Sequence, residues 1–252
     1  MRKSENINTL LALSEQGDQK ARIQLCNKLG MMYYHGHDGV EQNYEEAAKY
    51  FQAADDKNML GECYLHGLGV EPNIEKTIEL WEKACEEHCR YYDVMFKLAH
   101  LYGDGIEMEP DYEKARYWWR SLAENDEGVF GQLGAFPQAM YQLACYYYEG
   151  KGVKKDLKQA LKYFRYTIDL FTQMEWIYYK EYDREQYTIK NYFREKHGNI
   201  TISDEPDFII HARKILVKNG YKSAINKIIN DAQKGDKRAA EILKEFGIPF
   251  DA

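Results

Sequence analysis

Apolar and polar residues recur along this chain with a helical period, and one phrase appears four times. It holds Leu, a small residue at i+1 and Tyr at i+4, followed by a glycine-rich turn. It stands as LGMMYYHGHDGV, LGECYLHGLGV, LAHLYGDGIEM and LACYYYEGKGV, from Leu29, Leu60, Leu98 and Leu143. Because these spacings place the apolar residues on one face of a helix, each phrase predicts a helix that ends in a turn.

A second phrase follows each time and predicts a second helix. It stands as NYEEAAKYFQAA, NIEKTIELWEKA, DYEKARYWWRSL and DLKQALKYFRYT, from Asn43, Asn73, Asp111 and Asp156. Asn and Asp are favoured helix N-caps. Four residues beyond each N-cap is a small residue, and four further on is an aromatic ring, so both face one side. We expect the aromatic residues Trp81 and Trp119 to be buried between adjacent units.

These helix pairs predict an all-α solenoid, because one pair alone cannot bury its apolar face whereas stacked pairs can. We expect a single domain over residues 1–252. Its segments are an N-terminal capping helix (1–19), repeats (20–57, 58–88, 89–124 and 137–170), insertions (125–136 and 171–206), a degenerate repeat (207–234) and a C-terminal cap (235–252). The second unit lacks about two helical turns before Leu60, so its first helix should be short.

The two phrases resemble the Sel-one-like repeat, a relative of the tetratricopeptide repeat. HGLGV, EGKGV, Lys114 with Ala115, and the tryptophans Trp81 and Trp119 match that pattern, and the resemblance covers residues 21–167. It implies a right-handed α/α superhelix whose first helices line the concave side. It also implies protein–protein interaction, as in adaptors and scaffolds. In bacteria, small members that consist of repeats alone also serve as immunity proteins that bind toxins.

The first helices carry unusual residues on the face opposite their packing positions. A solvated face would hold Lys, Glu and Gln, whereas this one is rich in aromatic, Met and His side chains. We predict that they bind a protein partner; the alternative is that the superhelix or the inserted helix covers them. The predicted partner-binding residues are Met31, Tyr34, His35, Leu65, His66, Phe96, His100, Tyr141 and Tyr148.

Charge and composition narrow the function further. Lys and Arg total 34 against 41 Asp and Glu, a net charge of −7. Nucleic-acid binding needs a basic footprint, so we expect no nucleic-acid partner and favour a basic protein, such as a basic toxin. No apolar run suits a signal peptide or a membrane span. The lack of such a run, together with the odd number of five cysteines, predicts a cytoplasmic protein with free thiols. We also expect it to bind no membrane.

Catalytic and metal-binding motifs are missing from the sequence. It contains no P-loop, dinucleotide-binding glycine motif, HExxH or CxxC. Cys85 and Cys89 lie four residues apart, and His35 and His37 lie two residues apart beside Asp38, but neither group has further ligands at zinc-site spacing. We therefore expect no cofactor, no metal and no enzymatic activity. A weaker alternative is an enzyme that uses the 171–206 insertion.

Overall fold

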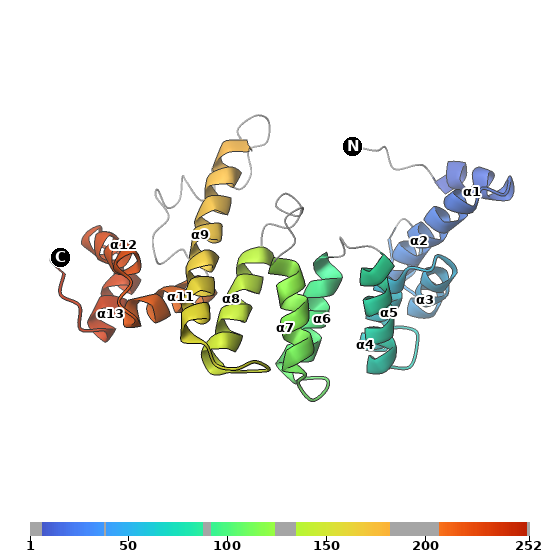
Figure 1. Ribbon diagram of the computed structural model, residues 1–252. Coiled ribbons are helices and arrows are strands. Elements are labelled where there is room, and N and C mark those ends of the chain that lie inside the picture. The colour runs from blue at the N-terminus through green and yellow to red at the C-terminus, as the bar shows by residue number, and fades with distance from the viewer. Residues whose placement is uncertain (1–6, 38, 88–91, 124–134, 182–206, 251–252) are drawn as a thin grey trace. The chain divides into compact units, whose positions relative to one another are not determined.

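The computed structural model describes residues 7–37, 39–87, 92–123, 135–181 and 207–250, without the side chains of 135–136 and 172–181. Within these ranges all regular structure is helical, which confirms the all-α prediction. The helices belong to two compact units (Figure 1). Unit 1 holds residues 1–98 with 106–108, and unit 2 holds residues 99–105 with 109–252.

Unit 1 consists of consecutive helices that pack against one another. They are α1 (Ile7–Glu15), α2 (Gln19–His35), α3 (Tyr44–Ala53), α4 (Lys57–His66), α5 (Ile74–Glu87) and the beginning of α6 (Tyr92–Asp104). Each helix from α1 to α4 contacts the next one along the chain. Helix α4 has 10 residues against 17 in α2, which confirms the short first helix predicted for the second unit.

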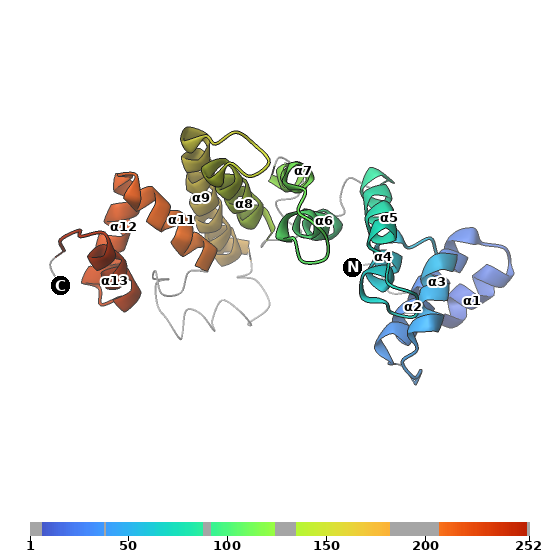
Figure 2. The ribbon, with the colours of Figure 1, turned by 90° about the horizontal axis from the view of Figure 1, so that it is seen from below.

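Unit 2 begins with the end of α6 and continues to the C-terminus. Its other helices are α7 (Tyr112–Ala123), α8 (Ala135–Glu149), α9 (Leu157–Glu181), α11 (Asp207–Lys218), α12 (Lys222–Gln233) and α13 (Lys237–Glu245). Helices α8 and α9 lie side by side, and α11 packs against both (Figure 2). Helix α9 continues into the segment predicted as the second insertion, so that insertion begins as an extension of the fourth repeat.

The predicted N-caps begin the second helices. The Asn43 side chain accepts a hydrogen bond from the Glu46 N–H at 3.1 Å. Asn73, Asp111 and Asp156 do the same for the residue three positions later, at 2.8–3.0 Å. Each N-cap also donates its own N–H to the carbonyl of the repeat tyrosine, at 2.8–2.9 Å. These bonds connect the two helices of each pair and satisfy donors that a helix start leaves unpaired.

The turn of one repeat touches the second helix of the repeat before it. Gly69, with φ of +72°, lies so close to Tyr44 that a Cβ would stand 2.2 Å from the Tyr44 carbonyl. Gly152, with φ of +60°, lies against Tyr112 at the start of α7, where a Cβ would stand 2.6 Å from the Tyr112 carbonyl carbon. Both positions need glycine, because of the left-handed backbone and because the neighbouring main chain leaves no room for a side chain.

The aromatic residues of the second helices form the core between paired helices. Phe51 and Phe164 are completely buried, and Trp81 and Trp119 are 1% exposed, which confirms that both tryptophans are buried. The predicted location between adjacent units is corrected for Trp81, which packs on the first helix of its own repeat. The small residue of each first helix makes this possible. A Cβ on Gly61 would lie 2.2 Å from the Trp81 Nε1, so the ring packs directly on the helix backbone.

The C-terminal helices complete unit 2. In α12, Ala224 and Ile228 are buried, as predicted for the small and aromatic positions of a degenerate repeat. Helix α13 buries Ala239, Ile242 and Leu243, so its apolar side closes the stack. Residues 125–134 of the first insertion and 182–206 of the second lie outside the described part of the chain.

Candidate partner-binding face

In unit 1, the predicted binding residues lie at the C-terminal ends of α2 and α4 and in the middle of α6. His35 and His66 are exposed, whereas the other members are half-buried. Those other members are Met31, Tyr34, Leu65 and Phe96. The half-buried side chains keep part of their surface accessible while packing holds them in place, a state that lowers the entropy lost on binding.

Tyr34 is held by neighbouring rings and connects α2 with α4. Its ring lies edge-on to Tyr44, with centroids 5.4 Å apart, and packs near Phe51 at 6.1 Å. The Gln42 amide donates to the Tyr34 carbonyl at 3.0 Å and to the Tyr44 hydroxyl at 2.9 Å. Burial raises the pKa of Tyr34, and the negative charge of Glu62 raises it further. Glu62 is therefore an electrostatic neighbour of this ring.

Glu62 connects α4 with α6. Its carboxylate forms an ion pair with Lys97 of α6 and lies 3.4 Å from the His66 Nε2. The Lys97 ammonium also lies 5.5 Å from the centre of the Trp81 ring. Asn58, one turn before Glu62, donates to Asp93 at 3.2 Å. These polar contacts join α4 to the N-terminal part of α6 within unit 1.

In unit 2, His100 and Tyr148 lie over the aromatic core. The His100 ring stands edge-on to Trp119, with centroids 4.9 Å apart, and its Nδ1 lies 3.0 Å from the Asp104 carboxylate. Tyr148 packs edge-on to Phe164 at 6.1 Å. Both side chains are half-buried. Like Tyr34 in unit 1, each of them packs near an aromatic core residue of a second helix.

Tyr141 is covered by α11. Its hydroxyl lies 2.8 Å from the His211 Nδ1, and its ring packs against Phe208 with centroids 5.6 Å apart. Burial raises the pKa of Tyr141 and lowers that of His211, so the folded chain favours neutral imidazole. Since the unfolded chain binds that proton more readily, this contact loses stability as pH falls below about 6.5. At this position another segment does cover the predicted face, and that segment is α11.

Sequence reasoning overlooked the charged members of the same face. Glu62, Asp104 and Glu149 occupy the same helical positions as the predicted residues of their helices, but the prediction includes only aromatic, Met, His and Leu side chains. The signal was present, because the three acids recur at neighbouring turns of successive first helices. The face therefore combines rings with carboxylates.

Metal-ligating side chains do not gather in the part of the chain that the structure describes. No group of three or more His, Cys, Asp or Glu residues there could hold a metal ion. His35 and His37 stack with ring centroids 5.8 Å apart, while Asp38 lies outside the described residues. The described helices also include none with the length and apolar character needed to cross a membrane.

The four described cysteines, Cys26, Cys63, Cys85 and Cys145, are free thiols; Cys89 lies outside the described residues. Burial raises the pKa of Cys63 and Cys145 to about 11 and that of Cys85 to about 12. Since the thiolate is the reactive form, these three should react slowly with Ellman's reagent at pH 8 in the folded protein.

After unfolding in guanidinium without reductant, we expect all five cysteines to react. Three or fewer reactive groups would indicate a disulfide and contradict the prediction of free thiols. Rapid reaction of every thiol in the folded protein would contradict the burial of these three side chains.

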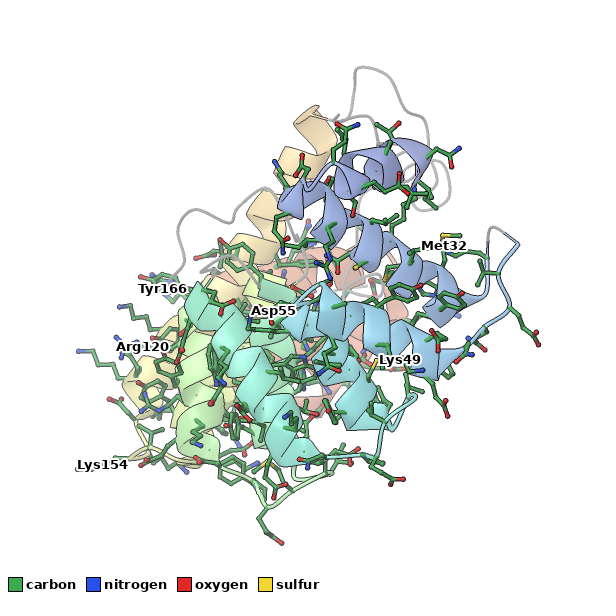
Figure 3. All side chains as sticks on the ribbon, turned by 90° about the vertical axis from the view of Figure 1, so that its right-hand side faces the viewer. Met32, Lys49, Asp55, Arg120, Lys154 and Tyr166 are labelled. Atoms are coloured by element: carbon green, nitrogen blue, oxygen red, sulfur yellow. The ribbon has the colours of Figure 1, made fainter. Side chains whose placement is uncertain are left out.

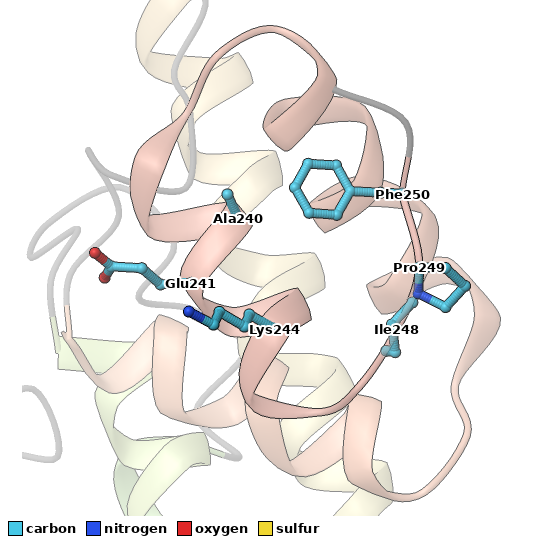
Figure 4. Close-up of a pocket in the computed structure, with 6 residues that line it drawn as sticks. All are labelled: Ala240, Glu241, Lys244, Ile248, Pro249 and Phe250. Atoms are coloured by element: carbon cyan, nitrogen blue, oxygen red, sulfur yellow. The ribbon is translucent and has the colours of Figure 1, made fainter.

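An open groove of about 450 Å³ lies beside α13 at the C-terminal end (Figure 4). Its lining is largely apolar, with one acidic and one basic side chain at its edge. The lining residues are Ala240, Glu241, Lys244, Ile248, Pro249 and Phe250. These residues supply contact surface but no group of catalytic side chains.

Helix pairs that share an aromatic core and touch the next repeat through a glycine turn define an α/α repeat protein. The family model described as the Sel1 repeat matches residues 23–54, 55–89, 93–127 and 137–170, which is more than half of the chain. The chain belongs to the Sel1 repeat family. Sel1 repeat proteins are generally non-catalytic scaffolds and protein-interaction modules.

Solved structures agree with this fold. The crystal structure of a Sel1 repeat protein from Oxalobacter formigenes is similar over 96% of each chain, with 20% identity and a TM-score of 0.50. That of c5321, a protective antigen in uropathogenic Escherichia coli strains with an SLR fold, shows 18% identity and a TM-score of 0.50. That similarity covers 97% of this chain and 61% of the other. No curated protein sequence matches significantly. At these identities the likeness concerns the fold, and it confirms the predicted α/α solenoid class.

Proposed function

We propose that this protein is a non-catalytic, cytoplasmic interaction module that binds a protein partner on the concave face formed by its first helices. The observation that carries the proposal is the recurrence of half-buried rings on the first helices α2, α6 and α8, each packed near an aromatic ring of the core. Aromatic side chains contribute large contact area at small entropic cost and are enriched among residues that dominate binding energy. Tyr34, His100 and Tyr148 have these properties.

A basic partner fits this face best. Glu62, Asp104 and Glu149 share the outward positions of the first helices with the rings. Unit 1 as a whole has 11 Lys and Arg against 18 Asp and Glu, so it carries the chain's full net charge of −7. Opposite charge accelerates association and disfavours wrong partners. Binding should therefore weaken as salt concentration rises.

This charge also favours the immunity role, in which the partner is a basic toxin that the protein neutralises by direct binding. Adaptor and immunity protein differ in the partner, not in the binding face. A gene encoding a secreted toxin beside the gene for this protein would favour immunity. Protection of cells that express this toxin would establish it.

Replacing Tyr34 with alanine should weaken partner binding by about 1–3 kcal/mol, because an anchoring ring is lost. The partner is first isolated by affinity capture from a lysate of the source cells, and its affinity is then measured by calorimetry. Tyr33→Ala is the matched control, since Tyr33 is also half-buried and stacks on Tyr50 with centroids 5.6 Å apart. It should bind as the unmodified protein does.

Tyr148→Ala and Tyr147→Ala form a second matched pair, in which Tyr147 stacks on Tyr163. Equal loss of affinity in both members of a pair would mean that altered stability, not the face, explains the effect. Full affinity in Tyr34→Ala and Tyr148→Ala together would place the interface elsewhere.

A further inference from the structure

The outward positions of the second helices differ in charge between repeats. Counting from the N-cap, positions 2, 6 and 9 are exposed in every second helix of the four repeats, except that position 9 of α5 is half-buried. They hold Glu75, Glu79 and Glu82 in α5, but Lys158, Lys162 and Arg165 in α9. The same fold thus accepts either sign at these positions, so repeat packing does not require the basic residues of α9.

The basic residues of α9 form one continuous face. Lys158, Lys162 and Arg165 are spaced by four and three residues, which places them on one side of the helix. All three are exposed, whereas Ala160 and Phe164 on the other side are buried. Lys154 and Lys155, in the turn before α9, are also exposed. We call Lys154, Lys155, Lys158, Lys162 and Arg165 the basic face of α9.

An exposed ring lies within this face. Tyr166 is 36% exposed, and the Lys162 ammonium and the Arg165 guanidinium lie 5.5 and 5.8 Å from its ring centre. Figure 3 shows Tyr166, Lys154 and Arg120 at the same edge of the view. A tyrosine beside cations offers an apolar ring and a hydroxyl to a ligand that carries negative charge.

Little negative charge offsets this face. Residues 150–166 contain six Lys and Arg and one acid, Asp156, whose carboxylate caps α9 by accepting from the Gln159 N–H. Arg165 lies 3.8 Å from Asp169. Lys158 and Lys162 form no ion pair with any residue that the structure describes. The face is therefore a concentration of positive charge on an acidic protein.

We propose that the basic face of α9 binds an acidic segment of a partner protein. From Lys158 to Arg165 the helix rises about 10 Å, a length that three or four residues of an extended peptide cover. A duplex nucleic acid carries one charge per about 1.7 Å, so it would leave most phosphates unneutralised here and would meet the acidic residues elsewhere on the chain. The residues to be substituted, Lys158, Lys162 and Arg165, lie on a second helix, whereas the Lys155 ammonium at the edge of the basic face lies 5.7 Å from the ring centre of Tyr148 in the first-helix face. The basic face has the opposite charge to the first-helix face, so its proposed partner differs from the one proposed above.

The probe for this site is fluorescein-labelled polyglutamate, with binding measured by fluorescence anisotropy at low salt. The unmodified protein should bind it, and affinity should fall as sodium chloride is added. The variant K158E/K162E/R165E gives α9 the acidic residues that α5 already carries. Because three attractive charges become repulsive, affinity should fall at least about tenfold.

The matched control is K49E/K76E/K83E, which makes the same change of charge on exposed positions of α3 and α5. It should retain most of the affinity. Circular dichroism verifies the folding of both variants, and K158Q/K162Q/R165Q replaces the first variant if that one unfolds. Tyr34→Ala should bind polyglutamate normally, so a failure of the first-helix face is distinguishable from a failure here.

Three results would overturn the proposal. One is the absence of polyglutamate binding, or binding that α9 substitutions leave unchanged. Another is tighter binding of oligothymidylate or phosphatidylserine vesicles through the same residues, which would assign the face to a nucleic acid or a membrane. The last is self-association in sedimentation that K158E/K162E/R165E abolishes, without polyglutamate binding, which would assign the face to a second copy.

Discussion

Replacing Trp81 with alanine should lower the free energy of unfolding by about 3–5 kcal/mol, the largest effect expected for any single substitution discussed for this protein. The indole is 1% exposed and rests directly on the backbone at Gly61. Its Nε1 donates to the Asn58 carbonyl at 3.1 Å. The substitution therefore creates a cavity and also removes the donor from that carbonyl. Denaturant titration followed by far-UV circular dichroism measures the change.

Two further variants serve as controls for this experiment. Trp81→Phe should cost less than Trp81→Ala, because phenylalanine fills the same position in the first and fourth repeats. Tyr117→Ala removes a ring that is 61% exposed and should change stability by less than about 0.5 kcal/mol. If Trp81→Ala were as stable as Tyr117→Ala, the result would contradict the placement of Trp81 in the aromatic core of the second repeat.

Replacing Gly69 with alanine should cost about 2–4 kcal/mol, since two penalties combine. The backbone at Gly69 has φ of +72°, which side chains disfavour. The added Cβ would also stand 2.2 Å from the Tyr44 carbonyl, so α3 or the turn would have to move. Because this contact joins the first repeat to the second, the loss should appear in the cooperative unfolding of unit 1.

Gly39→Ala separates the two penalties. Gly39 has φ of +83° in the equivalent turn of the first repeat, but among the described residues, apart from its chain neighbours, no atom lies within 4 Å of its ideal Cβ position. It should cost only about 1–2 kcal/mol, the price of the left-handed backbone. The difference between the two variants then reports the contact between repeats. Equal losses would show that the Gly69–Tyr44 contact contributes nothing to stability.

Together, the two proposals describe a scaffold whose binding surfaces lie on different helices of the repeat. The first-helix face carries rings with carboxylates, and the basic face of α9 carries lysines with an exposed tyrosine. On these two proposals, one partner is basic and the other is acidic. The substitutions above test each surface without disturbing the other.

Repeated local patterns made most of the fold predictable from the amino-acid sequence. An N-cap such as Asn43, a glycine at a turn such as Gly69 and a ring such as Trp81 each depend on interactions within one helix pair or between neighbouring pairs. The same requirement recurs in each repeat. Four equivalent positions in the aligned repeats therefore reveal it, even where one repeat has a different residue type. The structure confirms the N-caps, the left-handed glycines and the buried aromatic column for this reason.

The candidate site was only partly predictable. Helical periodicity identifies the face that holds Tyr34 and His100. Glu62 has the same periodicity, but a charged residue is also typical of an ordinary solvated helix face, so its type alone does not indicate a binding residue. The charge reversal between α5 and α9 was also visible in the aligned phrases. The charge reversal indicates a binding surface only because Lys158 and Lys162 are exposed, since a charged residue at a buried position would have a structural role.

Tertiary packing decided what periodicity leaves open. Periodicity indicates which side of a helix faces away from the other helix of its pair. It does not indicate which distant segment packs on that side. Tyr141 and Tyr34 occupy the same kind of face, yet α11 covers Tyr141 through Phe208 and His211, some 70 residues away in sequence. The Glu62–Lys97 ion pair depends in the same way on the approach of α4 and α6. Neither the types of these residues nor their spacing in the sequence indicates which residue each one contacts. Only the folded structure shows these contacts.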